Sequence, residues 1–194
     1  MNWVIPGTVV QIPKDEADRV EESFSSMFLG GGIALGQVAK ITGLEPYTVQ
    51  NWVKRGFLPP PEQKRYSLRQ LCRILNINML RASLPLERIC SLLSFVNGRL
   101  DDTADDIIDD AVLYFLFVRL AARARQLDEP GQWEQAMEAA LADYREPIPG
   151  ARDRVEKALR VMLTAWIAAR MRQEAERQLQ SLDEEMNEIK ENKQ

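Results

Sequence analysis

The stretch from Leu35 to Val53 constrains the fold more than any other part of this 194-residue chain. Its apolar residues recur three and four positions apart on both sides of Gly43, which is the spacing of two amphipathic helices. Glycine takes a left-handed backbone conformation at no steric cost, and proline is favoured as the first residue of a helix. Gly43 therefore predicts a sharp turn, and Pro46 predicts the start of the second helix.

The placement of small and apolar residues around this turn is typical of a DNA-binding helix-turn-helix. Ala39 lies four residues before Gly43, and apolar Val49 and Trp52 lie six and nine residues after it. A small residue at position 39 allows the second helix to cross close over the first. We therefore expect a helix-turn-helix, with an ordinary helical hairpin as the alternative.

The second helix carries polar and cationic residues on the side that its apolar residues leave outside. Asparagine and glutamine pair with the edge of adenine, whereas lysine and arginine pair with guanine or with phosphate. We predict double-stranded DNA as the partner of this face. The predicted contacts are Tyr47, Thr48, Gln50, Asn51, Lys54 and Arg55.

The segment after this helix predicts a small two-stranded wing. Three consecutive prolines at positions 59–61 exclude a helix and favour an extended arm, and a second extended piece follows. Cations on such a wing contact the sugar-phosphate backbone and position a protein without reading its sequence. The predicted contacts here are Lys64, Arg65 and Tyr66, with a plain solvated loop as the alternative.

The charge is distributed unevenly, although the net charge of the whole chain is only −4. Residues 33–99 carry ten Lys or Arg and three Glu, a net +7, between flanks of −3 (residues 1–32) and −8 (residues 100–194). A basic segment between acidic flanks indicates local contact with phosphate. We expect four further arginines to add to this basic surface: Arg69, Arg73, Arg81 and Arg88.

The segment 33–97 contains a VAKITG turn, an RGFLPP stretch leading into the wing, an RYS stretch leading out of it, and a short LPLERI helix. In these features it resembles the N-terminal domain of the MerR family of bacterial transcription regulators. Through QNWVKRG and INMLRASL it also resembles an uncharacterised bacterial family with a MerR-like front end. The resemblance implies a homodimer on a pseudo-palindromic promoter. Base preference does not carry over, because Gln50-Asn51-Trp52 stands where MerR proteins usually have Arg-Tyr-Tyr.

The remainder of the chain predicts helices. The acidic stretch 101–110 indicates the solvated start of a helix running to about residue 125, with a divalent-cation site as the weaker alternative. Residues 111–118 are apolar on nearly all sides, so that helix should be buried in a core or between subunits. Pro130-Gly131 should interrupt the chain before a helix over 132–144.

From residue 151 to about 190 no proline or glycine occurs, so one helix of about 60 Å is expected. Apolar residues in both halves of this helix alternate at four and three, which is the pattern of a coiled-coil seam. We expect a homodimer through these helices, with packing on the helix's own domain as the alternative. The seam residues are Val155, Leu159, Met162, Trp166 and Ala169, then Ala175, Leu179, Leu182, Met186 and Ile189.

The predicted fold class is therefore mainly α, in three parts. A helical extension (1–32) precedes a MerR-like winged helix-turn-helix (33–99) and an all-helical dimerisation or effector domain (100–194). The predicted function is a sequence-specific, DNA-binding transcription regulator; the alternative is a protein-interaction adaptor that keeps the winged fold without binding DNA.

Histidine and cysteine, which are common in catalytic and transition-metal sites, are absent or few in this chain. The chain has no histidine and two cysteines, Cys72 and Cys90, which fall in apolar helical patterns and predict small core residues. With no nucleophile beside a base and no cofactor-binding loop, we expect no enzyme, no catalytic residue, no cofactor and no metal site. The absence of a secretory signal and of a membrane span predicts a cytoplasmic protein. The sequence does not identify an effector.

Overall fold

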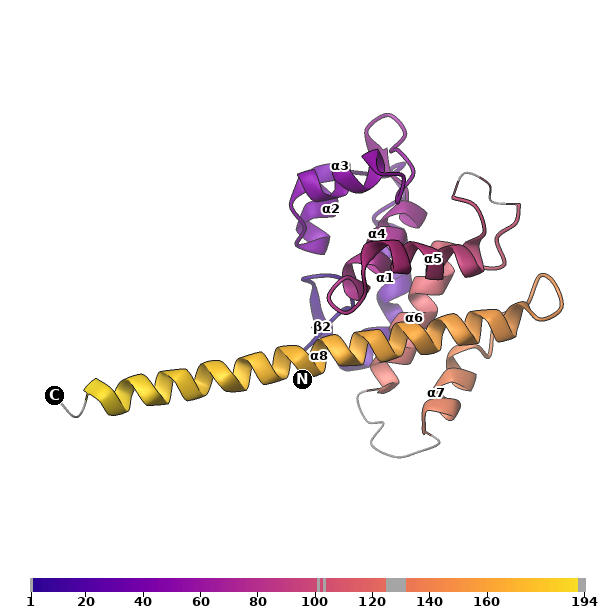
Figure 1. The fold of residues 1–194 in the computed structure, drawn as a ribbon. Coiled ribbons are helices and arrows are strands. Elements are labelled where there is room, and N and C mark those ends of the chain that lie inside the picture. The colour runs from indigo at the N-terminus through magenta and orange to yellow at the C-terminus, as the bar shows by residue number, and fades with distance from the viewer. Residues whose placement is uncertain (1, 101, 103, 125–131, 192–194) are drawn as a thin grey trace.

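The computed structural model is mainly helical, and it describes residues 2–191 apart from residues 101, 103 and 125–131 (Figure 1). The mainly α class is confirmed. The elements follow in the order β1 (Asn2–Val4), β2 (Gln11–Pro13), the 3₁₀ helix η1 (Lys14–Arg19), α1 (Val20–Ser26), β3 (Ile33–Ala34), α2 (Leu35–Thr42), α3 (Pro46–Lys54), β4 (Arg65–Tyr66), α4 (Leu68–Leu80), α5 (Leu86–Asn97), α6 (Asp110–Ala124), α7 (Gln132–Ala140) and α8 (Ala151–Glu191).

The N-terminal segment is a β-hairpin. β1 pairs antiparallel with β2, and Trp3 lies opposite Ile12. The turn is closed by the hydroxyl of Thr8, which accepts a hydrogen bond from the Val10 N–H at 2.9 Å. The region 1–32 therefore begins with a two-stranded sheet and is not helical throughout.

Residues 14–26 form two kinds of helix in succession. The segment begins as the 3₁₀ helix η1 and becomes α-helical only in α1. Phe24 is buried and stacks on Tyr114 of α6, with ring centroids 6.3 Å apart. Met27, the residue after the last residue of α1, is exposed.

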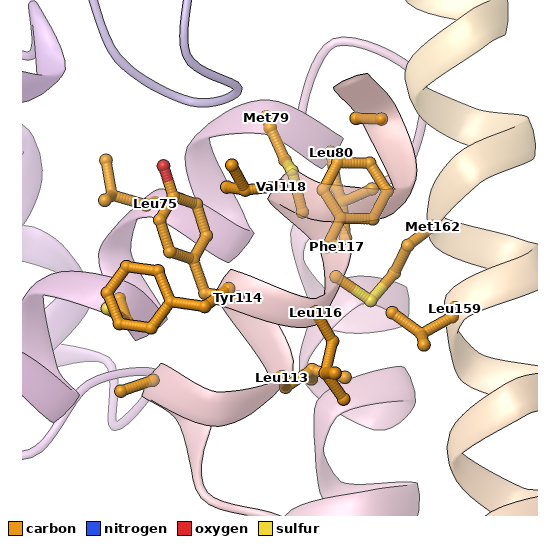
Figure 2. Close-up of a cluster of buried hydrophobic side chains, with 14 of the residues drawn as sticks. Leu75, Met79, Leu80, Leu113, Tyr114, Leu116, Phe117, Val118, Leu159 and Met162 are labelled. Carbon is orange, nitrogen blue, oxygen red and sulfur yellow. The ribbon is translucent and has the colours of Figure 1, made fainter. Parts of the chain in front are cut away.

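α6 forms the centre of the core, between α4 and α8 (Figure 2). Leu113, Tyr114 and Phe117 are fully buried, which confirms the burial expected for a helix that is apolar on nearly all sides. Each such side chain contributes about 1.5–3 kcal/mol when it leaves water. Packing around α6 therefore holds the N-terminal hairpin, α4 and α8 together, and the core is continuous across residues 32 and 100. The three-part domain division stays a prediction.

α8 is one continuous helix of 41 residues, as the lack of proline and glycine predicted. Its first half packs on the body of the molecule, and its second half extends beyond the body (Figure 1). The first-half seam residues Val155, Leu159 and Met162 are fully buried within their own chain, so packing on the same chain explains that half. In the second half, Leu179 is 60% exposed and is not packed against the rest of its own chain.

Some predictions fall outside what the structure describes. They are the interruption at Pro130-Gly131, the carboxylate of Asp101, and the seam position of the Ile189 side chain. Among the helices that are described, none combines the length and the apolar character needed to cross a membrane.

Candidate functional site

The connection between α2 and α3 is built around a left-handed glycine, as predicted. Gly43 has φ +70°, and its N–H donates to the carbonyl of Ala39 at 2.8 Å. A Cβ atom on Gly43 would lie 2.5 Å from Cγ1 of Val9, so a larger residue would require the Val9 side chain to move. The buried hydroxyl of Thr42 accepts from the N–H of Leu44 at 3.1 Å. Local hydrogen bonds and packing thus fix the direction in which α3 leaves the turn.

α3 begins at Pro46 and buries one side only. Val49 and Trp52 are buried, in agreement with the predicted spacing. α2, α3 and the loop after them project from the end of the molecule opposite α7 (Figure 1). The helix is therefore held by one face and leaves its other face uncovered.

The uncovered face of α3 carries the residues predicted to contact DNA. Gln50, Asn51 and Lys54 are exposed, Tyr47 is 63% exposed, and Thr48 is partly buried. Within the described part of the chain, the side chains of Gln50, Asn51 and Lys54 make no hydrogen bond and no ion pair. We call these three residues the α3 triad. Their donors and acceptors are free to bind a partner.

Arg55, at the C-terminal end of α3, has partners within the chain. Its guanidinium donates to Glu87 of α5 at 2.8 Å and lies over the ring of Phe57 at 4.6 Å. The side chain is still about half exposed. An exposed ion pair of this kind is worth less than about 1 kcal/mol, so Arg55 can exchange Glu87 for another anion.

A tight turn at Gln63 and Lys64 follows the proline arm. Both residues have positive φ, +47° and +63°, and the Arg65 N–H donates to the Glu62 carbonyl at 2.8 Å. These are the features of the two-residue hairpin turn that normally contains Asn and Gly. Non-glycine residues in this conformation store strain, and such strain is often found at ligand-binding sites. Lys64 is exposed at the tip of the turn.

Beyond this turn, β4 places its two residues on opposite sides. β4 pairs with β3, with Ile33 opposite Tyr66 and Ala34 opposite Arg65. Arg65 is exposed and donates to the carbonyl of Gly32 at 2.9 Å. Tyr66 is 3% exposed, and burial raises the pKa of its phenol. Tyr66, which we predicted among the DNA contacts, faces the core in the free chain, because successive residues of a strand face opposite sides.

Two residues of α4 that the sequence analysis did not select for this role hold the arm between α3 and the turn. Gln70 donates to the carbonyls of Pro59 and Pro60, at 3.2 and 2.9 Å. Arg73 donates through Nε to the carbonyl of Phe57 at 3.0 Å. Gln70 also completes the cap of α4 with Ser67, and that capping pattern was a local signal that Gln70 is structural.

The expectation that Arg69 and Arg73 belong to a basic surface is wrong. Arg73 is buried at 4% side-chain exposure, and its Nη1 lies 3.2 Å from Oδ2 of Asp110, which is 1% exposed. Arg69 pairs with Asp106 at 2.6 Å and with Asp109 at 3.5 Å. The acidic stretch therefore neutralises two of the ten cations counted in residues 33–99.

The acidic stretch is also not the solvated beginning of a helix, because α6 begins only at Asp110. Burial raises the pKa of the Asp110 carboxyl, while Arg73 and Arg69 oppose that rise by favouring the charged form. The described residues contain no group of three or more His, Cys, Asp or Glu side chains arranged to hold a metal ion. The acidic residues thus connect α4 to α6.

Comparison with known proteins extends over part of the chain. The model of a family described as a domain of unknown function (DUF1836) matches residues 33–116, less than half of the chain. The matched region begins at β3 and ends within α6. "Uncharacterized protein YkrK" of Bacillus subtilis (strain 168) is 29% identical over 86 residues, which cover 42% of this chain and 37% of that protein. The match therefore spans little more than a third of the relative's length. No solved structure matches significantly.

Proposed function

We propose that this chain is a sequence-specific regulator of transcription that binds double-stranded DNA through a MerR-like winged helix-turn-helix. In this proposal α2, the Gly43 turn and α3 form the helix-turn-helix, and the turn at Gln63 and Lys64 with its short strands forms the wing. The observation that carries the proposal is the exposed α3 triad, which has no partner within the described chain. A helix that exposes amides and a cation on one face suits the major groove.

The exposed residues divide into two roles. Gln50 and Asn51 present amides that can pair with the edge of adenine, and Lys54 presents a cation for guanine or phosphate. Tyr47 and Thr48, near the start of α3, contact the sugar-phosphate backbone. The backbone contacts beyond α3 come from Arg55, Lys64 and Arg65, which are exposed.

The regulator acts as a homodimer. One recognition helix reads few base pairs, and two copies related by a two-fold axis read two half-sites. The exposed second half of α8, which carries Leu179, Leu182 and Met186, supports an interface between copies.

Selection of bound fragments from the source genome, followed by gel-shift titration at several salt concentrations, tests this function. We expect a small set of enriched fragments bound at least 10³-fold more tightly than average DNA, with an affinity that falls as salt rises. Salt-sensitive binding that is equal on all fragments would contradict sequence specificity.

The ion pairs of Arg69 and Arg73 favour a second candidate, a protein-interaction adaptor that keeps the winged fold. These pairs reduce the cationic surface, and residues 100–194 carry a net charge of −8. The same titration separates the two candidates, because an adaptor shows no salt-sensitive binding to any fragment at any accessible concentration.

A further inference from the structure

A cleft lies between the N-terminal hairpin, the C-terminal end of α4 and the middle of α8. The hairpin lines it with residues 3–8, α4 with Asn78 and Met79, and α8 with Trp166 and Arg170. Its volume is about 400 Å³. Small-molecule sites in proteins are concave and usually measure about 300–1,000 Å³, so this cleft is large enough for one small organic molecule.

The hairpin wall of the cleft is held in place by α4 and α6. The buried hydroxyl of Tyr114 donates to the carbonyl of Pro6 at 2.8 Å, and Nδ2 of Asn78 donates to the carbonyl of Gly7 at 2.8 Å. A Cβ atom on Gly7 would lie 2.5 Å from the carbonyl oxygen of Leu75, so the absence of a side chain allows this close approach. The cleft is therefore preformed, and a preformed site loses less conformational freedom when a ligand binds.

The side chains around the cleft favour an anion with an apolar body. Arg170 is the only charged residue among the described residues that line the cleft, and its guanidinium lies 4.7 Å from the ring centroid of Trp166. A guanidinium stacked on a ring presents its N–H donors around its edge, where they match the geometry of a carboxylate. Trp3, Met79 and Trp166 supply apolar surface for the rest of the ligand.

One donor on the hairpin wall lacks an acceptor. Trp3 is 2% exposed, and its indole N–H makes no hydrogen bond to any described residue. Buried donors without an acceptor are unfavourable and rare in native proteins. A ligand oxygen in the cleft satisfies this N–H after a small movement of the side chains that cover it.

We propose that this cleft binds a small organic anion, an apolar body of about 10–20 non-hydrogen atoms that carries an acidic group such as a carboxylate. The acidic group pairs with Arg170, and the body packs against Met79 and the hairpin wall. This site goes beyond the proposed function, since it is argued without reference to DNA and would stand if the protein bound none.

A fluorescence titration of the full chain with anilinonaphthalene sulfonate tests the site. This probe combines aromatic rings with one anionic group, and it should bind one site per chain with a dissociation constant of about 1–100 μM. Arg170→Gln should raise that constant about 10-fold, because it removes the charge-assisted contact. Arg172→Gln is the matched control, because Arg172 pairs with Glu176 and does not line the cleft. It should change the constant less than about 2-fold.

Phenylnaphthylamine, an uncharged probe with the same ring systems, tests the need for an anion. The wild type should bind it at least about 10-fold more weakly than the sulfonate, and Arg170→Gln should leave its affinity unchanged within about 2-fold. Equal affinity of the wild type for the two probes would overturn the proposal.

Filling the cleft tests where the probe binds. Ala82 lines the cleft, and Ala82→Trp should abolish saturable binding of the sulfonate. Ala168→Trp adds the same side chain at an exposed position of α8 outside the cleft and should leave binding unchanged. Circular dichroism checks that the variants keep their helices. No saturable binding to the wild type, equal effects of Arg170→Gln and Arg172→Gln, or unchanged binding to a folded Ala82→Trp variant would each overturn the proposal.

Discussion

α3 and α4 belong to the same basic segment, and they use their polar side chains in opposite ways. α3 exposes the α3 triad, which has no partner in the described chain. α4 turns Arg69 and Arg73 toward the acidic residues before and at the start of α6, and Arg73 is buried there. This difference shows that the net charge of a segment does not indicate how many of its charged side chains can bind a partner. What matters is which cations still lack a partner once the chain has folded.

The first prediction concerns the buried side of this comparison and has the largest expected effect. Arg73→Ala should lower the free energy of unfolding by about 3–5 kcal/mol, because it leaves the buried carboxylate of Asp110 with only the longer, 3.8 Å contact to Arg69. Urea denaturation measures the change.

Arg88→Ala on α5 is the matched control, because Arg88 is exposed and has no ion pair within the described residues. It should change the free energy of unfolding by less than about 0.5 kcal/mol. If Arg73→Ala were as mild, the buried pair would not connect α4 to α6 as described.

The second prediction concerns the exposed side. Asn51→Ala should lose about 1–3 kcal/mol of discrimination at the base pair that we propose Asn51 contacts, while binding to unrelated DNA stays unchanged. Competition binding on a panel of singly substituted sites measures it. If the variant bound every DNA sequence more weakly by the same factor, Asn51 would contact the sugar-phosphate backbone, and other residues would recognise the bases.

The third prediction separates binding from folding at the strained turn. Lys64→Gly removes a cation from a residue with φ +63°, where glycine is unstrained. Stability should rise by up to about 1 kcal/mol, whereas DNA affinity should fall several-fold on all sequences and the salt slope should flatten by about one unit.

Gln63→Gly is the control for the turn, because it relieves the strain at φ +47° and keeps the lysine. It should stabilise the fold in the same way and leave the salt slope unchanged. A flattened slope in this variant too would show that the shape of the turn, and not the charge of Lys64, is what DNA requires.

The fourth prediction, the smallest, tests the position of Tyr66. Burial raises the pKa of its phenol above the usual 10.0, so the unfolded chain loses this proton first as pH rises. The free energy of unfolding should therefore fall as pH rises through 10 toward the folded pKa, by less than about 1 kcal/mol for this group at pH 10.5.

Tyr66→Phe should reduce that alkaline loss and leave DNA affinity unchanged, as measured by denaturation at pH 8 and 10.5 and by binding at neutral pH. A large loss of DNA affinity with an intact fold would place Tyr66 among the DNA contacts after all.

The sequence predicted those parts of the fold that depend on local signals. Gly43 predicted the sharp connection, and Pro46 predicted the start of α3. Their conformations are set within a few residues, where the relevant physics is steric and short-ranged. The same holds for α8, where the absence of helix breakers was sufficient.

Prediction from the sequence failed where the deciding contacts join residues that are far apart along the chain. Arg73 and Asp110 lie 37 positions apart, so each looked like a solvated charge when read with its neighbours. The β1–β2 hairpin has strands too short to show alternation. Tyr66 could have been assigned correctly, because the strand predicted at Arg65 already implied that its neighbour faces the other way.

A DNA-affinity comparison of the wild type with a variant in which the α3 triad is replaced by alanine tests the central claim most directly. Both proteins would be titrated against the most enriched genomic fragment at fixed salt, with unfolding curves to confirm an intact fold. We expect the variant to bind that fragment at least about 100-fold more weakly at unchanged stability, because in our proposal the triad supplies both base recognition and a phosphate contact. Equal affinity of the two proteins would contradict the account.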